Sequence, residues 1–240
     1  MRRSRHRRAA IQGGALLLAT PLLVSPAAAQ LGGSLTLSSQ ARLRGQAISD
    51  HRPTFELDLV QDSSEGLYLG AAGAVVATRD DGLKPLSFRA YAGFAQQLSA
   101  ATTIDVGLVH SRYGRYSGIS GGRSYTEAYL GIAGRNISGR LFLSPAYFQG
   151  DEPTLYMEVN GNLDLGRYWA LIGHGGRLVY LKNPSGGHAP DATDWQIGLR
   201  RRLGRFDLEA AWTGHAADRP GYDGKYGAKT ALVIALTFTL

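Results

Sequence analysis

The chain contains no cysteine and offers little for a helical membrane anchor. Without cysteine there is no disulfide framework, no thiolate metal site and no lipid-anchored N-terminal Cys. A membrane-spanning helix needs about 20 consecutive apolar residues, whereas the apolar stretch Ala15 to Val24 is short and contains Thr20 and Pro21. A helical anchor is therefore the less favoured interpretation of this stretch.

Residues 1–29 also lack acidic side chains. Met1 to Arg8 carries five arginines, the apolar stretch follows, and Ala27-Ala28-Ala29 offers small residues for cleavage. This order of parts predicts a secretory signal peptide over residues 1–29, cleaved after Ala29. Because the hydrophobic pair typical of a twin-arginine signal is missing after Arg2-Arg3, we expect export of the unfolded chain.

The basic character of the chain depends on this first segment. The whole chain has 26 basic and 19 acidic residues, a net charge of +7. Five of the basic residues and none of the acidic residues precede Gln30, so the remainder has 21 basic and 19 acidic residues, a net charge of +2. The pI therefore does not indicate a nucleic-acid partner.

From Gln30 onward the sequence shows no helical period of useful length and no linker. It shows instead segments of about ten residues with two-residue alternation, separated by Gly, Asp, Asn and Pro clusters. The expected strands cover residues 34–44, 54–61, 66–77, 86–96, 102–112, 124–133, 137–147, 154–164, 168–180, 193–203, 206–214 and 229–240. Twelve is an even number, as in bacterial barrels. We therefore predict an all-β fold, a single antiparallel up-and-down transmembrane β-barrel of about 12 strands over residues 30–240.

The connections between these segments alternate between short and long. The short ones are Gln61 to Gly66, Gln97 to Ala101, Gly134 to Asn136, Gly166-Arg167 and Gly204-Arg205. The long ones are Gln46 to Pro53, Thr78 to Pro85, Tyr113 to Arg123, Phe148 to Pro153, Lys182 to Ala192 and His215 to Ala228. With the N-terminus in the periplasm, the short connections become periplasmic turns and the long ones external loops, as in outer-membrane barrels.

Two of the short turns repeat the pattern Leu-Gly-Arg-aromatic, in Leu165 to Tyr168 and Leu203 to Phe206. Glycine in the first central position permits the positive φ of a type II′ two-residue hairpin. Counting outward from the second turn pairs Arg202 with Asp207 and Arg200 with Glu209, and directs Ile197, Leu199, Leu208 and Ala210 to the lipid.

The last ten residues, Ala231 to Leu240, alternate between apolar and smaller side chains and predict a closing strand. Its apolar and aromatic end resembles the C-terminal signal that outer-membrane barrels present to their insertion machinery. We therefore expect two partners, the outer-membrane lipid and the barrel-insertion machinery, and an outer-membrane location in a Gram-negative bacterium.

Alternation also predicts which polar residues face the lumen, since Arg or Lys on the lipid face would cost roughly 2–4 kcal/mol near the midplane. The lumen-lining candidates are Arg42, Arg44, Glu56, Asp58, Arg89, Asp105, Glu127, Glu158, Arg200, Arg202, Asp207 and Glu209, with Asn160 and Asn162 beside them. Such charges can filter solutes or simply pair across the interior. Barrels of about eight strands are nearly filled and those of 16 to 18 are open. A barrel of twelve strands lies between them, so its lumen charges can either filter solutes or pair structurally.

The aromatic residues near the strand ends suit a membrane-interface girdle. They are Tyr68, Tyr91, Tyr129, Tyr147, Tyr156, Tyr168, Trp169, Tyr180, Trp195 and Trp212. We expect most of them to belong to this girdle.

The sequence offers little for catalysis, and we predict no catalytic residue, cofactor or metal site. His110 and Ser111 are adjacent, but neighbours on a strand point to opposite faces. His174, His188 and His215 lack metal-site spacing, and we expect them to be solvent-exposed residues in or near external loops.

Four groups of residues carry a family resemblance. They are Leu35-Thr36-Leu37-Ser38-Ser39-Gln40-Ala41-Arg42-Leu43-Arg44-Gly45 with Ser49-Asp50, Gly66-Leu67-Tyr68-Leu69-Gly70, Tyr125-Thr126-Glu127-Ala128-Tyr129-Leu130-Gly131, and Ser144-Pro145-Ala146-Tyr147-Phe148 with Pro153-Thr154-Leu155-Tyr156. Together these stretches resemble a known family of proteobacterial outer-membrane proteins of unknown function, called Gcw_chp. The resemblance implies a porin-like outer-membrane β-barrel with no catalytic residues to transfer.

Three functions follow as hypotheses. The first is a porin-like, non-enzymatic barrel that gives small polar solutes a narrow passage lined by the arginines and acids named above. The second is a closed structural or adhesion barrel that acts through its external loops. The third is a lipid hydrolase at the rim that would use His110.

Overall fold

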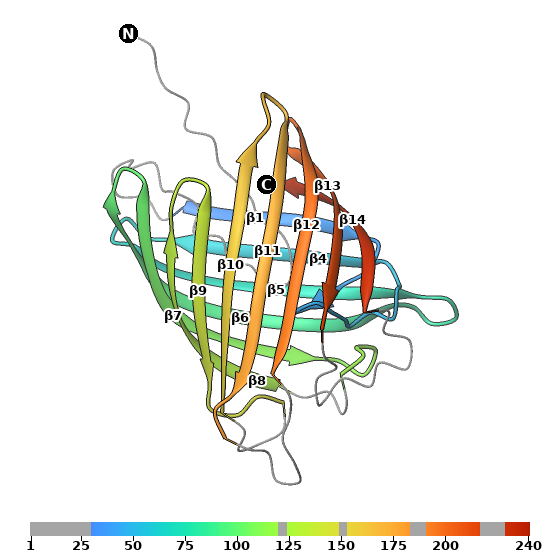
Figure 1. Cartoon of the computed structure of the whole chain (residues 1–240). Helices are drawn as coiled ribbons and strands as arrows, with labels where there is room; N and C mark the ends of the chain where they lie inside the picture. The colour runs from blue at the N-terminus through green and yellow to red at the C-terminus, as the bar shows by residue number, and fades with distance from the viewer. Residues whose placement is uncertain (1–29, 120–123, 149–152, 183–190, 217–228) are drawn as a thin grey trace.

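The computed structural model describes residues 30–119, 124–148, 153–182, 191–216 and 229–240. Twelve strands in these ranges form one closed antiparallel barrel, in which each strand pairs with its neighbours in the chain and β1 pairs with β14 (Figure 1). The barrel strands are β1 (Gln30–Ser38), β4 (Thr54–Asp62), β5 (Leu67–Thr78), β6 (Gly82–Ser99), β7 (Thr102–Tyr113), β8 (Ser124–Ala133), β9 (Ile137–Ser144), β10 (Thr154–Asp164), β11 (Trp169–Tyr180), β12 (Ala192–Leu203), β13 (Phe206–His215) and β14 (Thr230–Thr239). The predicted fold class is confirmed.

The alternation in sequence becomes an apolar outside and a mixed inside. On β4, Phe55 and Leu57 are exposed on the outer face, while the alternating Glu56 and Asp58 are less exposed and point inward. A closed barrel also pairs the backbone groups of its strands, which is the condition for crossing a bilayer with strands. Among the described residues, no helix is long and apolar enough to span a membrane.

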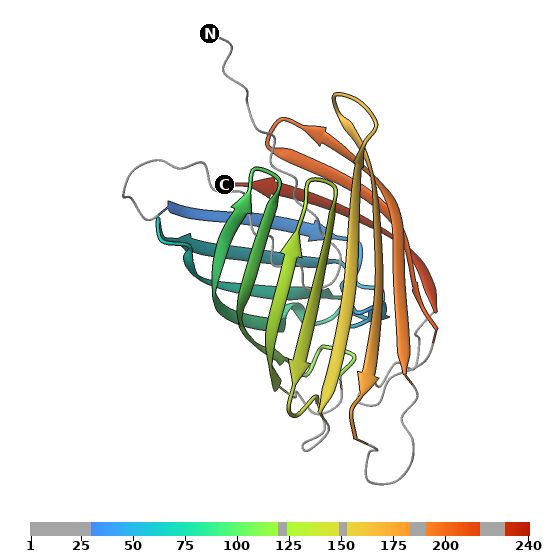
Figure 2. The same ribbon diagram turned by 60° about the vertical axis from the view of Figure 1, so that its left-hand side comes forward.

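Short turns gather at one end of the barrel, which we call the short-turn end (Figures 1 and 2). The chain passes from β1 to β4 at the opposite end, which we call the long-loop end. One predicted long loop is shorter than expected, because β5 and β6 continue to Thr78 and from Gly82 and leave residues 79–81 as the connection. A register shift between Ala74 and Val75 accompanies this extension.

The two Leu-Gly-Arg-aromatic turns differ. The second has the predicted register, since Leu203 pairs with Phe206 and Arg200 with Glu209, and Gly204 has a φ of 69°. The first was predicted wrongly: Asp164 pairs with Ala170, so residues 166–168 form a three-residue loop. An odd loop length changes which β11 residues share a face with those of β10.

The first strand also differs from the prediction of 34–44. β1 ends at Ser38, and residues 39–53 leave the wall to form a small hairpin of β2 (Arg42–Leu43) and β3 (Gln46–Ala47), which we call the inner hairpin. Its two-residue turn has positive φ at Arg44 (48°) and Gly45 (79°), as a type I′ turn requires. Arg42 and Arg44 therefore lie on this hairpin and not on a wall strand.

The core of the protein lies inside the barrel, toward the long-loop end. Leu43 and Ile48 of the inner hairpin are buried there among aromatic side chains of the wall. These aromatic residues are Tyr91, Tyr113, Tyr125, Tyr129, Phe142, Tyr147, Phe148 and Tyr156. The inner hairpin is thus packed into the interior as part of the core.

Candidate functional site

The tip of the inner hairpin crosses the interior of the barrel. Arg44 Nη2 lies 2.6 and 2.8 Å from the two carboxylate oxygens of Glu127 on β8. Both side chains are nearly fully buried, with 5% and 4% of their surface exposed. Burial alone would lower the pKa of Arg44, but the adjacent Glu127 carboxylate raises this pKa well above its usual value. Arg44 is therefore a permanent cation in the interior.

Aromatic rings surround this guanidinium. Its Cζ lies 4.0 Å from the ring centroid of Tyr156, 5.0 Å from that of Tyr147 and 5.8 Å from that of Phe142. A guanidinium within about 6 Å of a ring centroid is attracted to the electron-rich face of the ring. Glu127 and these three rings thus form a cage, which we call the Arg44 cage.

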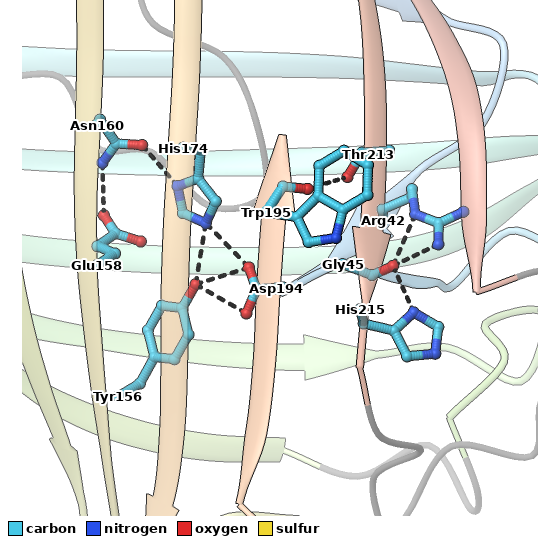
Figure 3. A network of polar contacts seen from close by, with 10 residues as sticks. All are labelled: Arg42, Gly45, Tyr156, Glu158, Asn160, His174, Asp194, Trp195, Thr213 and His215. Carbon is cyan, nitrogen blue, oxygen red and sulfur yellow. Dashed lines mark hydrogen bonds and ion pairs between the residues drawn. The ribbon is translucent and has the colours of Figure 1, made fainter. Parts of the chain in front are cut away.

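Gly45 fits closely against the opposite wall. Its carbonyl oxygen accepts hydrogen bonds from His215 Nδ1 at 3.1 Å and from Arg42 Nε at 2.8 Å (Figure 3). A Cβ at this position would lie 2.6 Å from the Cβ of Asp194 and 2.6 Å from the carbonyl oxygen of Gly214. Because φ is also positive, this position accepts glycine far better than any other residue.

A second connection covers the base of the hairpin. The amide of Gly118, in the connection after β7, donates to the carbonyl of Ile48 at 2.8 Å. Arg52 Nη2 donates to the carbonyl of Tyr116 at 3.2 Å. The inner hairpin therefore contacts β8, β9, β10, β12 and β13 through its tip and this connection through its base.

A small cavity lies beside Arg44. Glu127, Glu158 and Tyr156 also line it, and its volume is about 20 Å³. That is room for about one water molecule. Among the described residues, the inner hairpin and the side chains around it therefore leave little space beside Arg44.

A polar network links β10, β11 and β12 next to the cage (Figure 3). His174 Nε2 lies 2.9 Å from Asp194 Oδ1, and His174 Nδ1 lies 2.6 Å from Asn160 Oδ1. The Tyr156 hydroxyl donates to Asp194 at 3.1 Å, and the Asn160 amide donates to Glu158 at 3.4 Å. This network holds the Tyr156 ring, on which Arg44 stacks.

Other ion pairs join wall strands to each other. Arg140 on β9 lies 2.8 Å from Asp105 on β7, and its guanidinium lies 5.1 Å from the ring centroid of Tyr129. The remaining wall pairs are Arg89 with Glu56 at 3.0 Å, Arg200 with Glu209 at 3.0 Å, and Arg202 with Asp207 at 3.4 Å. These pairs connect strands that are direct neighbours in the barrel or that have one other strand between them.

A family described as "Bacterial protein of unknown function (Gcw_chp)" matches residues 25–240. The chain belongs to this family. No curated protein matches it in sequence.

Two solved structures show the same fold at 9% sequence identity. The NanC porin matches with a TM-score of 0.56 over 87% of this chain and 100% of that one. The KdgM porin in complex with disordered oligogalacturonate matches with a TM-score of 0.51 over 87% of this chain and 99% of that one. The barrel is therefore porin-like in fold.

The structure places the predicted lumen residues in two groups. The first group lies on the inward faces of barrel strands and consists of Glu56, Asp58, Arg89, Asp105, Glu127, Glu158, Asn160, Asn162, Arg200, Arg202, Asp207 and Glu209. Arg42 and Arg44 reach the interior from the inner hairpin. Sequence reasoning missed Arg140, Asp194 and His174, although Arg140 and Asp194 follow the same alternation.

The girdle prediction is wrong for most of the tyrosines. Tyr68, Tyr91, Tyr129, Tyr147 and Tyr156 lie in the interior or pack against its core, and Tyr180 is half-buried against that core. Tyr168, Trp169, Trp195 and Trp212 are exposed. The interior tyrosines have partners there: Tyr91 donates to Asp58 at 2.8 Å, and Tyr68 and Tyr129 hydrogen-bond each other.

The same parity could have found these tyrosines. Tyr156 stands two residues before Glu158, and Tyr129 stands two residues after Glu127, so each shares the face of a charged residue. Space for the rings comes from glycines on neighbouring strands. A Cβ at Gly107 would lie 2.4 Å from the Tyr129 hydroxyl.

Two of the three histidines predicted to be exposed are not. His174 belongs to the polar network inside the barrel, and His215 is buried against Gly45. His188 lies outside the described residues. His110 is exposed on the outer face, with Nδ1 2.9 Å from Thr126 Oγ1, whereas Ser111 is buried inside. Within the described ranges, no group of three or more His, Asp or Glu residues could hold a metal ion.

Proposed function

We propose that the protein is an outer-membrane channel for small polar solutes that the inner hairpin closes in the conformation described above. In this proposal, residues 1–29 direct export and are removed after Ala29, and residues 30–240 form the mature barrel. The apolar outer face meets the lipid, and β14, which ends next to Leu240, carries the contact with the insertion machinery. The long-loop end then faces outward.

The observation that carries the proposal is the position and composition of the inner hairpin. It is a loop inside a barrel, and it carries Gln40, Arg44, Gln46 and Ser49 into a buried environment. A buried ion pair often contributes no more stability than apolar side chains of similar volume. Permanent filling would be achieved more simply with apolar residues, so we interpret the polar hairpin as a closure that can be withdrawn.

The wall that remains after withdrawal suggests the charge of the solute. The described wall has these carboxylates on its inward faces: Glu56, Asp58, Asp62, Asp105, Glu127, Glu158, Asp164, Asp194, Asp207 and Glu209. The inward arginines of the same strands are Arg89, Arg140, Arg200 and Arg202. Because carboxylates outnumber guanidinium groups, this wall does not favour an acidic oligosaccharide such as the one in the KdgM complex.

The test is to remove the inner hairpin and record current. Ser38 and Thr54 are directly paired, so a two-residue Asn-Gly turn can replace residues 39–53 and keep the register of β1 and β4. In planar bilayers, we expect the deletion variant to conduct steadily and the intact protein to conduct rarely and briefly. Insertion is verified first by heat-modifiable mobility on gels.

A matched control shortens a different connection at the same end. Thr78 and Gly82 are also paired, and Asn-Gly can replace residues 79–81. This control should conduct like the intact protein. If the inserted hairpin deletion conducts no better than this control, the passage is rejected and the closed barrel that acts through its external loops becomes the better hypothesis.

A further inference from the structure

All parts of the Arg44 cage belong to the barrel wall and its connections. Glu127 lies on β8, Phe142 on β9 and Tyr156 on β10, and Tyr147 follows β9. Arg44 is the group that comes from the inner hairpin. Glu127, Phe142 and Tyr156 therefore remain in the wall when the hairpin leaves.

We propose that the Arg44 cage is a binding site for organic cations that carry a guanidinium or amino group, and that Arg44 occupies it as a tethered competitor. This inference rests on the proposed channel, because a free solute reaches the cage only after the hairpin withdraws. It names the solute class as organic cations.

The cage contains two kinds of group that attract a cation, a carboxylate and aromatic ring faces. One carboxylate faces the guanidinium at 2.6 and 2.8 Å, and aromatic faces lie within 6 Å of its carbon atom. Carboxylates bind guanidinium groups through paired charge-assisted hydrogen bonds. Aromatic cages recognise organic cations through the negative faces of their rings.

Arg44 uses only part of this site. Its Nη1 is buried and has no hydrogen-bond partner among the described residues. The Glu158 carboxylate lines the same cavity and is itself buried. A free cation of another shape, without a hairpin backbone attached, can place donors toward Glu158 as well as Glu127.

The overall charge points the same way. When the hairpin withdraws, Arg42 and Arg44 leave the interior with it, and the wall keeps the excess of carboxylates described above. Inside a low-dielectric barrel this excess raises the local concentration of cations and repels anions. The cage thus lies in a region that favours the solutes it can bind.

A second buried arginine, Arg140 on a wall strand, can be compared with Arg44. Arg140 has the same surroundings, with Asp105 at 2.8 Å and the rings of Tyr129 and Phe142 at 5.1 and 5.9 Å. It belongs to β9, which hydrogen-bonded neighbours hold on both sides. Arg140 cannot leave without unfolding the wall, so its surroundings are structural and the Arg44 cage can exchange its occupant.

The experiment empties the cage and offers it a soluble substitute for the missing side chain. Arg44→Ala is refolded, and n-propylguanidinium is added at millimolar concentration, with neutral n-propylurea as the matched control. We expect the cation to raise the unfolding temperature of Arg44→Ala and to reduce its single-channel current. The urea should do neither, and wild-type protein, in which Arg44 competes for the cage, should respond less than Arg44→Ala.

A second variant tests the carboxylate. In Arg44→Ala/Glu127→Gln, affinity for n-propylguanidinium should be roughly tenfold weaker, the loss expected for one charge-assisted hydrogen bond. Equal affinity in the two variants, or equal effects of n-propylguanidinium and n-propylurea, would overturn the cation site. Arg44→Met replaces Arg44→Ala if the smaller side chain prevents refolding.

The two readouts separate this inference from the proposed function. Stabilisation by the cation in inserted protein that never conducts supports the cage and rejects the channel. Current that the cation neither blocks nor changes, without stabilisation, supports the channel and rejects the cage.

Discussion

Two buried pairs of arginine and carboxylate inside this barrel have nearly the same chemistry and different attachments. Arg44 meets Glu127 at 2.6 Å and Arg140 meets Asp105 at 2.8 Å, and both guanidinium groups lie within 6 Å of the ring centroid of Phe142. Arg140 belongs to a wall strand, whereas Arg44 belongs to the two-residue turn of the inner hairpin. The attachment decides whether the pair supports the wall or closes the interior.

The difference becomes energetic when one partner is removed. Breaking a buried ion pair typically costs about 3–5 kcal/mol, because the remaining charge stays buried without compensation. A wall arginine must bear this cost in the folded barrel. Arg44 can avoid it by moving into solvent with the inner hairpin, so the cost is limited to the energy that docks the hairpin.

The largest expected effects come from neutralising each carboxylate. Asp105→Asn leaves Arg140 buried, and we expect the free energy of unfolding to fall by about 3–5 kcal/mol without added conductance.

Glu127→Gln should release the inner hairpin and raise the open probability of the channel about tenfold, with a smaller loss in the free energy of unfolding. Urea unfolding and bilayer recordings measure the two quantities. Equal stability losses with no change in current would remove the distinction between the pairs.

Gly45 sharpens the comparison by testing how the hairpin fits the wall. Gly45→Ala adds a Cβ that meets Asp194 and the backbone of Gly214 at 2.6 Å, so the hairpin should undock and conductance should rise. Gly82→Ala is the matched control, because Gly82 also has a positive φ, 71°, but nothing lies within 4 Å of a Cβ there. It should lose about 1–2 kcal/mol through backbone strain and leave the current unchanged. Closed channels in Gly45→Ala would show that the tip does not need this fit.

His215 contributes a smaller share of docking. His215→Ala removes the hydrogen bond to the Gly45 carbonyl, which is worth about 0.5–1.5 kcal/mol. Open probability should therefore rise by about twofold to tenfold. His110→Ala is the control, because this histidine is exposed on the outer face and should not alter the current. An effect of His110→Ala equal to that of His215→Ala would show that the hydrogen bond to the hairpin is not the cause.

The smallest effect is expected at the short-turn end. Arg202 and Asp207 are 3.4 Å apart and their side chains retain 35% and 14% exposure, so Arg202→Ala should cost about 0–1 kcal/mol. Arg200 pairs with Glu209 at 3.0 Å with 4% and 8% exposure, and Arg200→Ala should cost more. Chemical denaturation of the two variants compares them directly. Equal losses in the free energy of unfolding would indicate that burial does not decide how much each wall pair contributes to stability.

Local periodicity was enough to predict most of the wall. The bounds of β8 (Ser124–Ala133) and β10 (Thr154–Asp164) agree with the prediction, and the turn at Gly204 set the register of β12 and β13. These features depend on neighbouring residues, because a two-residue alternation assigns each side chain to a face and a short turn fixes the pairing beside it. The interior tyrosines on β8 and β10 follow the same rule, because Tyr129 and Tyr156 share the inward faces of Glu127 and Glu158.

The inner hairpin could not be predicted in this way. Residues 39–44 continue the alternation of β1, so nothing local shows that the strand ends at Ser38. That end depends on β4, whose pairing with β1 stops at Thr54. Likewise, Arg44 is 83 or more positions away in the chain from each residue of the cage that surrounds it.

The sequence by itself therefore determined a strand barrel with an apolar outside and a charged inside, because those properties follow from residue type and a period of two. Only the tertiary structure decided that the inner hairpin enters the barrel, that Arg44 meets Glu127 and that His174 lies in a buried network. Such contacts cross the interior, and they exist only after ring closure brings distant strands face to face.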